Sequence, residues 1–202
     1  MNIIYLISLF LFMLFFGAYI FKLIILYKRE GIKANVLGKR GKDKSIHKTE
    51  IFVQTTTFVW GLSWLIFSIA NLKSDKVSGL FIENDIMRLS GVLIMAFGLL
   101  IFISAMVSMK ASWRVGIDKK TKSKLITSGI YKYSRNPAFI GFYGMFIGYL
   151  LIYFNIFTLI IVVLNFISIH LLILQEERHL GILFGNEYAQ YAMETPRYIL
   201  FK

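Results

Sequence analysis

The sequence predicts an all-α, polytopic membrane protein with five transmembrane helices, a C-terminal helical hairpin and a short cytosolic tail. Hydrophobic residues make up 57% of the chain and the mean hydropathy is +0.66, both well above the values of soluble proteins. Several apolar stretches approach or exceed the roughly 20 residues that a helix needs to cross a bilayer. The 202 residues leave little room for a separate soluble domain. We therefore expect a single membrane domain, 1–202, with an N-terminal three-span part, 1–123, and a hairpin and tail, 124–202.

The predicted spans follow the apolar stretches of the chain. Three of them are 2–27, 51–72 and 86–109. The stretch 138–174 has no formal charge, and as one helix it would extend about 55 Å, far beyond a hydrocarbon core of roughly 30 Å. It must therefore turn back, and Asn155 is the polar residue at its middle, so this stretch predicts spans four and five.

The distribution of lysine and arginine predicts the orientation. The loops 28–50 and 110–137 hold eight basic residues each, and the tail from 175 holds three, whereas the segment 72–85 holds two. Cytoplasmic loops carry the excess of basic residues. We therefore expect the N-terminus outside and the C-terminus in the cytosol. The rich usage of Lys, Ile, Phe and Asn favours a bacterial cell membrane as the location.

Composition also argues against several classes of site. The net charge of +12 suits basic cytoplasmic loops, and no aromatic residues interleave the charges of the loop 28–50, so we expect no nucleic-acid partner. The chain has no cysteine, which excludes thiolate chemistry. His47, His170 and His179 show no paired metal spacing, so we predict no metal site. Phosphate-loop, dinucleotide-binding and serine-nucleophile motifs do not occur in the sequence.

Two charged clusters flank the predicted hairpin symmetrically. Arg135-Asn136-Pro137 precedes span four, and Glu176-Glu177 follows span five. Helix capping by asparagine with proline in the first turn, and a solvated pair of acids, explain each cluster separately. If the chain turns near Asn155, however, the two clusters meet at one membrane depth, and opposite charges converge at the mouth of a hydrophobic hairpin. This arrangement predicts a polar ligand held beside lipid.

The strings around these clusters resemble a known superfamily. They are KLITSGIYKYSRNPAFIG at 124–141, EERHL at 176–180, FGNEY at 184–188 with Tyr191, and PRY at 196–198. In this order and spacing they resemble the signature of the isoprenylcysteine carboxyl methyltransferase and phospholipid methyltransferase superfamily of integral-membrane methyltransferases.

The resemblance implies an S-adenosylmethionine-dependent methyltransferase that releases S-adenosylhomocysteine and acts on a membrane lipid or lipid-like substrate. Carried over by position, it implies a cofactor-binding set: Leu125, Thr127, Gly129, Tyr131, Arg135, Asn136, Pro137, Glu176 and Glu177. It implies that Arg197, Glu177 and Tyr188 act in catalysis, with Tyr191 also closing the site. Asn136 stands where eukaryotic carboxyl methyltransferases have histidine, and Phe139 where many members have tyrosine, which puts carboxyl methylation in particular in doubt.

Several alternatives stay open at this stage. The acceptor is a carboxylate, an amine or a hydroxyl of a lipid-like or isoprenoid-like molecule. An acceptor that must lose a proton has Glu177, Tyr188 or His170 as candidate bases. A membrane reductase of the sterol-reductase type, with a nicotinamide cofactor, is a second hypothesis, and a non-catalytic scaffold or transporter is a third. The sequence predicts no particular oligomeric state.

Overall fold

The computed structural model describes residues 2–73, 84–118 and 124–199, and these residues are mainly helical. This confirms the predicted all-α class. The α-helices are α1 (Asn2–Glu30), α2 (Lys44–Lys73), α3 (Asp85–Ser108), α4 (Pro137–Ile152), α5 (Ile156–Phe184) and α6 (Asn186–Glu194), with the 3₁₀ helices η1 (Lys110–Ser112) and η2 (Gly129–Lys132).

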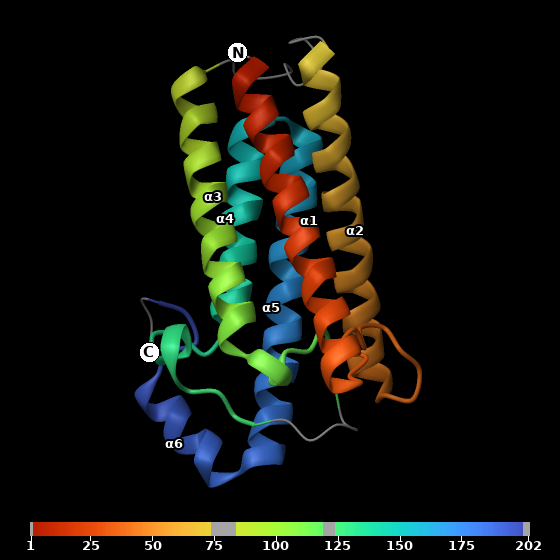
Figure 1. The fold of residues 1–202 in the computed structure, drawn as a ribbon, viewed down its shortest axis with the longest axis vertical. Helices are drawn as coiled ribbons and strands as arrows, with labels where there is room; N and C mark the ends of the chain where they lie inside the picture. Colours follow the sequence, from red (N-terminus) through yellow and green to blue (C-terminus); the bar gives the residue numbers. More distant parts are fainter. Residues whose placement is uncertain (1, 74–83, 119–123, 200–202) are drawn as a thin grey trace.

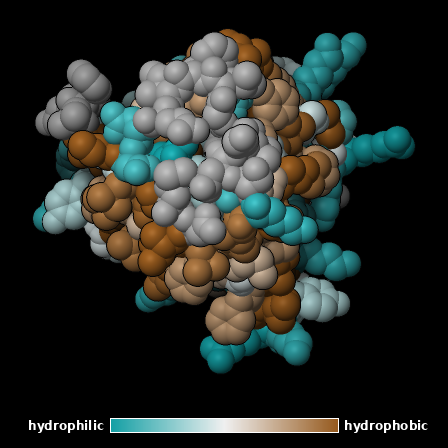
Figure 2. Space-filling view, turned by 90° about the horizontal axis from the view of Figure 1, so that it is seen from above, coloured by the Kyte–Doolittle hydropathy of each residue, from teal (hydrophilic) through white to brown (hydrophobic). Residues whose placement is uncertain are grey.

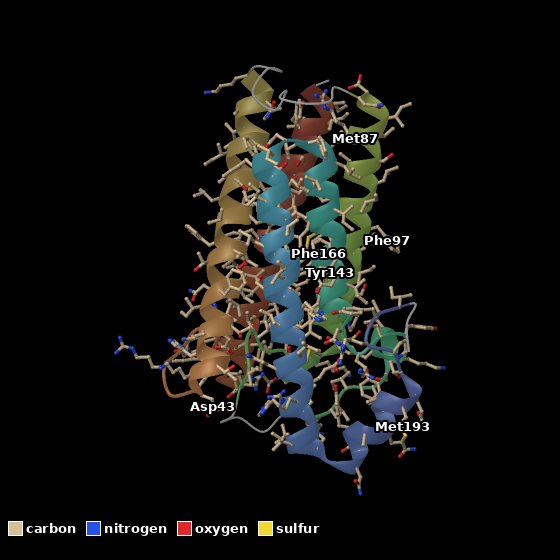
Figure 3. All side chains as sticks on the ribbon, turned by 180° about the vertical axis from the view of Figure 1, so that it is seen from behind. Asp43, Met87, Phe97, Tyr143, Phe166 and Met193 are labelled. Carbon is tan, nitrogen blue, oxygen red and sulfur yellow. The ribbon has the colours of Figure 1, made fainter. Side chains whose placement is uncertain are left out.

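The helices α1 to α5 run side by side along the long axis of the molecule (Figure 1). The N-terminus and the turn between α4 and α5 lie at one end. The loop between α1 and α2, the segment that contains η2, and α6 lie at the other end. The same division appears in Figure 3, where Met87 of α3 is at one end and Asp43 and Met193 are at the opposite end. The basic loop 28–50 and the described parts of 110–137 therefore share the end that carries α6.

Four helices are long and apolar enough to cross a membrane: α1, α2, α3 and α5. The helix α4 is also apolar, but its 16 residues extend only about 24 Å. Five helices thus occupy the predicted positions, while the count of five full spans and the orientation of the tail stay predictions.

The turn between α4 and α5 lies at the predicted residue. Asn155 is the N-cap of α5, and its Oδ1 accepts from the backbone N–H of Thr158 at 2.9 Å. The hydroxyl of Thr158 accepts from the backbone N–H of Asn155 at 3.1 Å, which completes a capping box. Because the cap satisfies backbone groups that lipid could not, a short turn between two apolar helices is stable at this place.

The end of the fifth helix differs from the prediction. The predicted tail starts at 175, but α5 continues for ten residues to Phe184, and Gly185 follows with a φ of 53°. The charged residues Glu176 and Glu177 interrupt the apolar pattern without ending the helix, because glutamate is a good helix former. Both acids therefore lie on a rigid helix that extends out of the bundle.

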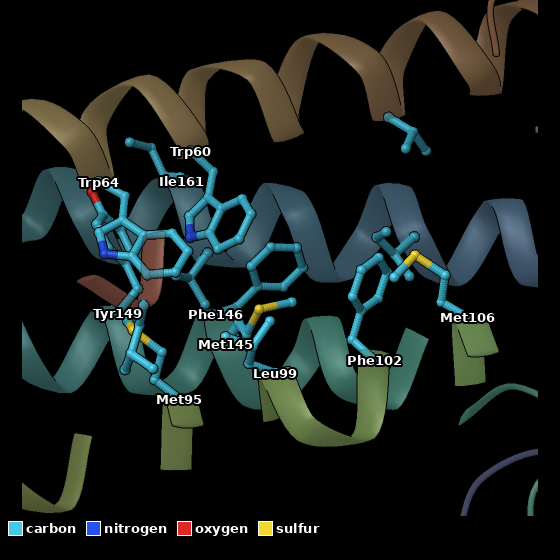
Figure 4. Packing of buried hydrophobic residues seen from close by; sticks show 14 of the residues in the cluster. Trp60, Trp64, Met95, Leu99, Phe102, Met106, Met145, Phe146, Tyr149 and Ile161 are labelled. Carbon is cyan, nitrogen blue, oxygen red and sulfur yellow. The ribbon is translucent and has the colours of Figure 1, made fainter. Parts of the chain in front are cut away.

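The core is rich in aromatic side chains. Trp60 and Trp64 of α2 are fully buried against α4, where the rings of Trp60 and Phe146 meet edge to face with centroids 4.8 Å apart (Figure 4). Tyr143 of α4 stacks on Phe166 of α5 at 4.5 Å (Figure 3). These contacts hold the two helices of the hairpin against each other and against α2.

Large apolar side chains also cover the outside of the bundle. Phe10, Phe58 and Phe97 are each more than 60% exposed, and apolar residues fill much of the visible surface between the projecting hydrophilic ones (Figure 2). A soluble protein does not expose apolar surface on this scale, whereas lipid solvates it. The chain is an integral membrane protein.

The helices α3 and α4 approach each other through glycine. A Cβ atom added at Gly98 would lie 2.7 Å from the carbonyl oxygen of Gly141, and one added at Gly148 would lie 2.5 Å from that of Gly91. Such distances are shorter than van der Waals contact, so no larger residue fits without separating the helices. The close approach fixes the start of α4, which carries part of the charged cluster.

We expect Gly148→Ala to destabilise the protein because its methyl group meets the backbone of α3. The matched control is Gly17→Ala, since nothing lies within 4 Å of a Cβ at Gly17. Overpacking costs about 1–3 kcal/mol, whereas alanine in a free helical position is neutral or stabilising. Thermal unfolding in detergent should show a lower midpoint for Gly148→Ala alone. Equal midpoints for the two variants would contradict the packing described here.

Candidate functional site

A shared carboxylate lies at the centre of the charged cluster. Oε2 of Glu177 accepts from Nη2 of Arg197 at 2.9 Å and from Nη2 of Arg135 at 3.2 Å. The Nδ2 group of Asn136 donates to Oε1 of Glu177 at 2.8 Å. The predicted convergence of the two clusters on neighbouring helices is thus confirmed for Glu177.

The same arginine also holds the C-terminal tail. Nη1 of Arg135 donates to the carbonyl oxygens of Ala192 and Thr195 at 2.8 and 2.9 Å, and its backbone N–H donates to that of Pro196 at 2.9 Å. All of these groups are half-buried or buried, so the bonds are little screened by solvent. Arg135 therefore joins the start of α4, the end of α5 and the tail into one unit.

The predicted cap at Asn136 is wrong in its detail. Pro137 does occupy the first turn of α4, but the Asn136 side chain makes no hydrogen bond to the helix N-terminus. Ser134 provides a nearby contact instead, because its hydroxyl accepts from the backbone N–H of Asn136 at 3.0 Å. A cap would need Oδ1 of Asn136 to accept from the first turn of α4, but the side chain is instead oriented so that its Nδ2 donates to the nearby Glu177 carboxylate, a charge-assisted bond.

Beside this cluster is a cavity of about 510 Å³. One wall comes from the hairpin, the tail and the segment before α4; the opposite wall comes from α1, α2 and the segments next to them. Aromatic and aliphatic side chains make up most of the lining, and the polar groups gather toward the end that carries α6. Lining side chains on the hairpin side include Leu125, Tyr131, Arg135, Asn136, Phe139, Phe142, Leu172, Glu176, His179, Tyr188 and Tyr191.

Glu176 differs from its neighbour in having no partner within the described part of the chain. Its side chain lines the cavity, and among the described residues it has no hydrogen bond and no ion pair, whereas Glu177 is bound by two arginines. An unpaired carboxylate against an apolar cavity is unfavourable unless a cation joins it. The cavity is therefore suited to a ligand that carries positive charge near Glu176.

Three tyrosines close the polar end of the cavity. The hydroxyl of Tyr191 donates to the carbonyl oxygen of Tyr131 at 2.7 Å, while that of Tyr188 is buried and has no partner among the described residues. Burial, and then the nearby Glu177 carboxylate, raise the pKa of Tyr188 to about 12. Burial also raises the pKa of Tyr131 and of Tyr191. All three rings thus stay neutral near pH 7, and Tyr188 has an unused hydroxyl to offer a ligand.

The structure brings together part of the predicted cofactor set. Leu125, Tyr131, Arg135, Asn136 and Glu176 line the cavity. Outside the lining set are Thr127 and Gly129, which are exposed, and Pro137 and Glu177, which adjoin it. Gly129 has a φ of 64°, so glycine suits the turn that leads into η2.

The predicted catalytic residues are placed differently from one another. Tyr188 lines the cavity, whereas Glu177 and Arg197 do not and bind each other beside it. The hydrogen bond to Glu177 is the main cause that raises the pKa of Arg197, so this guanidinium stays charged. His170 lies outside the lining set, where its Nδ1 and the Tyr198 hydroxyl are 2.8 Å apart. Glu177, Arg197 and His170 thus contact other protein groups and are not among the residues that line the cavity.

Sequence reasoning did not find the wall that the N-terminal part contributes. Lining residues there include Tyr19, Asn35, Gln54, Trp113 and Arg114. They follow no recognisable motif, and they lie far apart along the chain. His179 was considered only as a metal ligand, but it lines the cavity, and its Nε2 donates to the Asp118 carbonyl oxygen at 3.2 Å. A signal that could have pointed to this wall is the acidic Glu50 within a strongly basic loop.

Comparison with known proteins gives one match. The model of the phospholipid methyltransferase family matches residues 86–187, about half of the chain, from the start of α3 to the start of α6. No curated protein and no solved structure matches the chain.

The two adjacent acids should respond oppositely to removal of their charge. Glu177→Gln leaves Arg135 and Arg197 without their shared carboxylate, and breaking such a buried pair costs about 3 kcal/mol. Glu176→Gln removes an unpaired charge and should leave the unfolding midpoint equal or higher. Thermal denaturation in detergent, without ligand, measures both. Equal destabilisation by the two substitutions would mean that Glu176 has a structural partner.

Proposed function

The chain belongs to the phospholipid methyltransferase family, and we propose that it transfers the methyl group of S-adenosylmethionine to a lipid acceptor at the cytosolic face of a bacterial membrane. Family membership makes it a methyltransferase, and the apolar helices place it in a membrane. The identity of the methyl donor, the acceptor and the side of the membrane are the parts that we propose.

The unpaired Glu176 carboxylate is the observation that carries the choice of donor. S-adenosylmethionine has a sulfonium and an ammonium group, and either one can supply the cation that the cavity lacks near Glu176. Arg135 lines the same end of the cavity, and although its N–H groups already bind Glu177 and the tail, two guanidiniums share one carboxylate there, so the cluster keeps a net positive charge that attracts the carboxylate of the donor. Tyr188 adds a free hydroxyl for a ribose or amino-acid group. The residues present therefore fit this cofactor.

A sulfonium donor supplies an activated methyl group. The protein therefore needs to bind the donor and the acceptor, to orient them, and to exclude water. Phe139, Phe142 and Leu172 keep the middle of the cavity apolar, and α6 covers its polar end with Tyr188 and Tyr191. Alignment of the reacting groups and exclusion of water account for most of the rate in such transfers. The Glu177 cluster keeps this wall rigid, because its bonds fix α5 against the tail.

The structure disfavours the three bases that the sequence suggested. Glu177 is held by two arginines, Tyr188 has a pKa of about 12, and His170 does not line the cavity. The site therefore favours an acceptor that reacts without a strong base, such as a carboxylate or a neutral amine, over an alcohol.

Ligand binding distinguishes the proposed methyltransferase from the two alternative functions, a membrane reductase and a non-catalytic scaffold or transporter. A reductase of the sterol-reductase type would need room for a nicotinamide nucleotide, whose phosphates require cations or free helix N-termini. The unpaired ionisable side chain at the polar end of the cavity, among the described residues, is instead an acid, Glu176. In a scaffold or transporter, replacing Glu176 would not weaken the binding of a cofactor.

We expect S-adenosylhomocysteine to bind the detergent-purified protein, and Glu176→Gln to weaken that binding at least tenfold because an ion contact worth about 1.4 kcal/mol is lost. Calorimetry measures the affinity. Glu194→Gln is the matched control, since Glu194 is an exposed acid of α6 that does not line the cavity. Thermal stabilisation by NADPH in place of S-adenosylhomocysteine would favour the reductase, and no binding of either would oppose an enzyme.

Overexpression should increase a membrane lipid that is heavier by one CH₂ group, about 14 Da, than a lipid present without the protein. Lipid mass spectrometry of matched cells detects the shift. The matched control is overexpression of Glu176→Gln, which we expect to fold but not to methylate. The same new lipid in both strains would show that the methylation does not come from this site.

A further inference from the structure

Glu50 is a fully buried acid on α2, 0% exposed, in the part of the chain before the family match. Both of its carboxylate oxygens lie 2.6 Å from Nζ of Lys42. Oε2 accepts from the backbone N–H of Gly38 at 2.9 Å, and Oε1 accepts from that of Ile117 at 2.8 Å. A buried carboxylate with a cation and two backbone donors is fully satisfied and specifies one geometry.

These bonds join two segments that are distant in sequence. Gly38 belongs to the loop after α1, and Ile117 follows η1 after α3. Next to them, Asn35 and Val115 form an isolated parallel bridge, in which the N–H of Val115 donates to Ala34 and the N–H of Val36 donates to Val115, both at 2.9 Å. Two short segments outside any sheet would not keep this register alone. Glu50 supplies the anchor.

The anchored segments form part of the cavity wall. Asn35 and Leu37 line the cavity from the first segment, and Val115, Gly116 and Ile117 line it from the second. A Cβ at Gly116 would lie 2.8 Å from the backbone of Leu37 and 2.9 Å from Oε1 of Glu50, so the segments are packed without space between them. Among the described residues of this wall, no acid is unpaired as Glu176 is, because Asp118 is paired with Arg114.

We propose that Glu50 is a positioning residue for the methyl acceptor: it holds the segments around Leu37 and Val115 in place as the wall against which the acceptor lies. The inference rests on the proposed function in one respect, namely that the donor occupies the opposite wall at Glu176. The remaining volume then lies between the anchored segments and the apolar faces of α1 and α2, which carry Phe16 and Phe58. Those faces suit the acyl or prenyl chain of a lipid, and the anchored segments contact its headgroup.

Glutamine cannot replace this acid although it has the same shape. Its amide has one acceptor oxygen, so one of the N–H groups of Gly38 and Ile117 would face an NH₂ donor. Lys42 would also lose its counter-charge. At least one segment should then detach from α2, while the Glu177 cluster, which shares no residue with Glu50, stays intact.

The absence of cysteine allows a direct test on the full-length protein in detergent. A Leu37→Cys variant carries one thiol at the proposed wall, and its reaction with a water-soluble maleimide reports how often the wall opens. We expect Glu50→Gln to raise the labelling rate about tenfold. Lys42→Met should raise it as well, and Lys42→Arg, which keeps the charge, should restore slow labelling. The control thiol is Ile182→Cys, 80% exposed on α5, whose rate should not change.

Ligand protection then identifies what the wall faces. Dioleoyl phosphatidylethanolamine or N-acetyl-S-farnesylcysteine, an amine lipid and a carboxylate lipid, should slow labelling of Leu37→Cys, and S-adenosylhomocysteine should slow it less than twofold. S-adenosylhomocysteine should still bind Glu50→Gln, which shows that this variant folds. Protection by S-adenosylhomocysteine alone, or by neither lipid, overturns the acceptor assignment. An unchanged labelling rate in both Glu50→Gln and Lys42→Met overturns the anchoring role.

Failure of the proposed function gives a different result. If S-adenosylhomocysteine does not bind even the parent protein, the donor assignment fails, while the labelling rates still decide whether Glu50 anchors the wall.

Discussion

The carboxylate of Glu177 is the interaction on which the site depends. It is bound by guanidinium groups from the start of α4 and from the tail, and by the amide of Asn136. Successive residues on an α-helix are about 100° apart around its axis. Once Glu177 is fixed toward the arginines, the adjacent Glu176 must point elsewhere, and the side that it reaches is the cavity. One acid is thus used for structure, which leaves the other free for a ligand.

This division explains what the sequence could predict and what it could not. The symmetry of the two clusters about Asn155 places Arg135 and the acids at one depth, because helix length converts spacing into height. The turn and the meeting of the clusters follow from that. Spacing does not give rotation about the helix axis to within one residue, so it could not tell which acid binds the arginines. It also could not show that Asn136 would turn from the helix end to Glu177.

The second wall of the cavity was beyond prediction for a different reason. Its residues come from α1, from the loop after it, from α2 and from the segment after α3, and contacts between them depend on how the helices pack. The packing itself is set by close approaches such as Gly98 against Gly141 and by large rings such as Trp60 against Phe146. A glycine or a tryptophan in an apolar stretch indicates that packing matters there, but not which helix it meets.

The two walls of the cavity suit different parts of the proposed reaction, the donor and the acceptor. A charged donor of fixed structure needs an acid and hydrogen-bond donors at set positions, and these lie on the rigid hairpin and on the tail that Arg135 holds. The lipid acceptor that we propose needs an apolar channel whose shape selects the chain, and the residues of the N-terminal helices that line the cavity could supply it, although they follow no motif. Glu50 and Glu177 anchor the two walls through separate sets of bonds, and a hydrogen bond from Nε2 of His179 to the Asp118 carbonyl oxygen joins the walls directly. Apolar residues of the channel that take no part in these bonds could therefore change the fit to the acceptor that we propose while the donor site keeps its contacts.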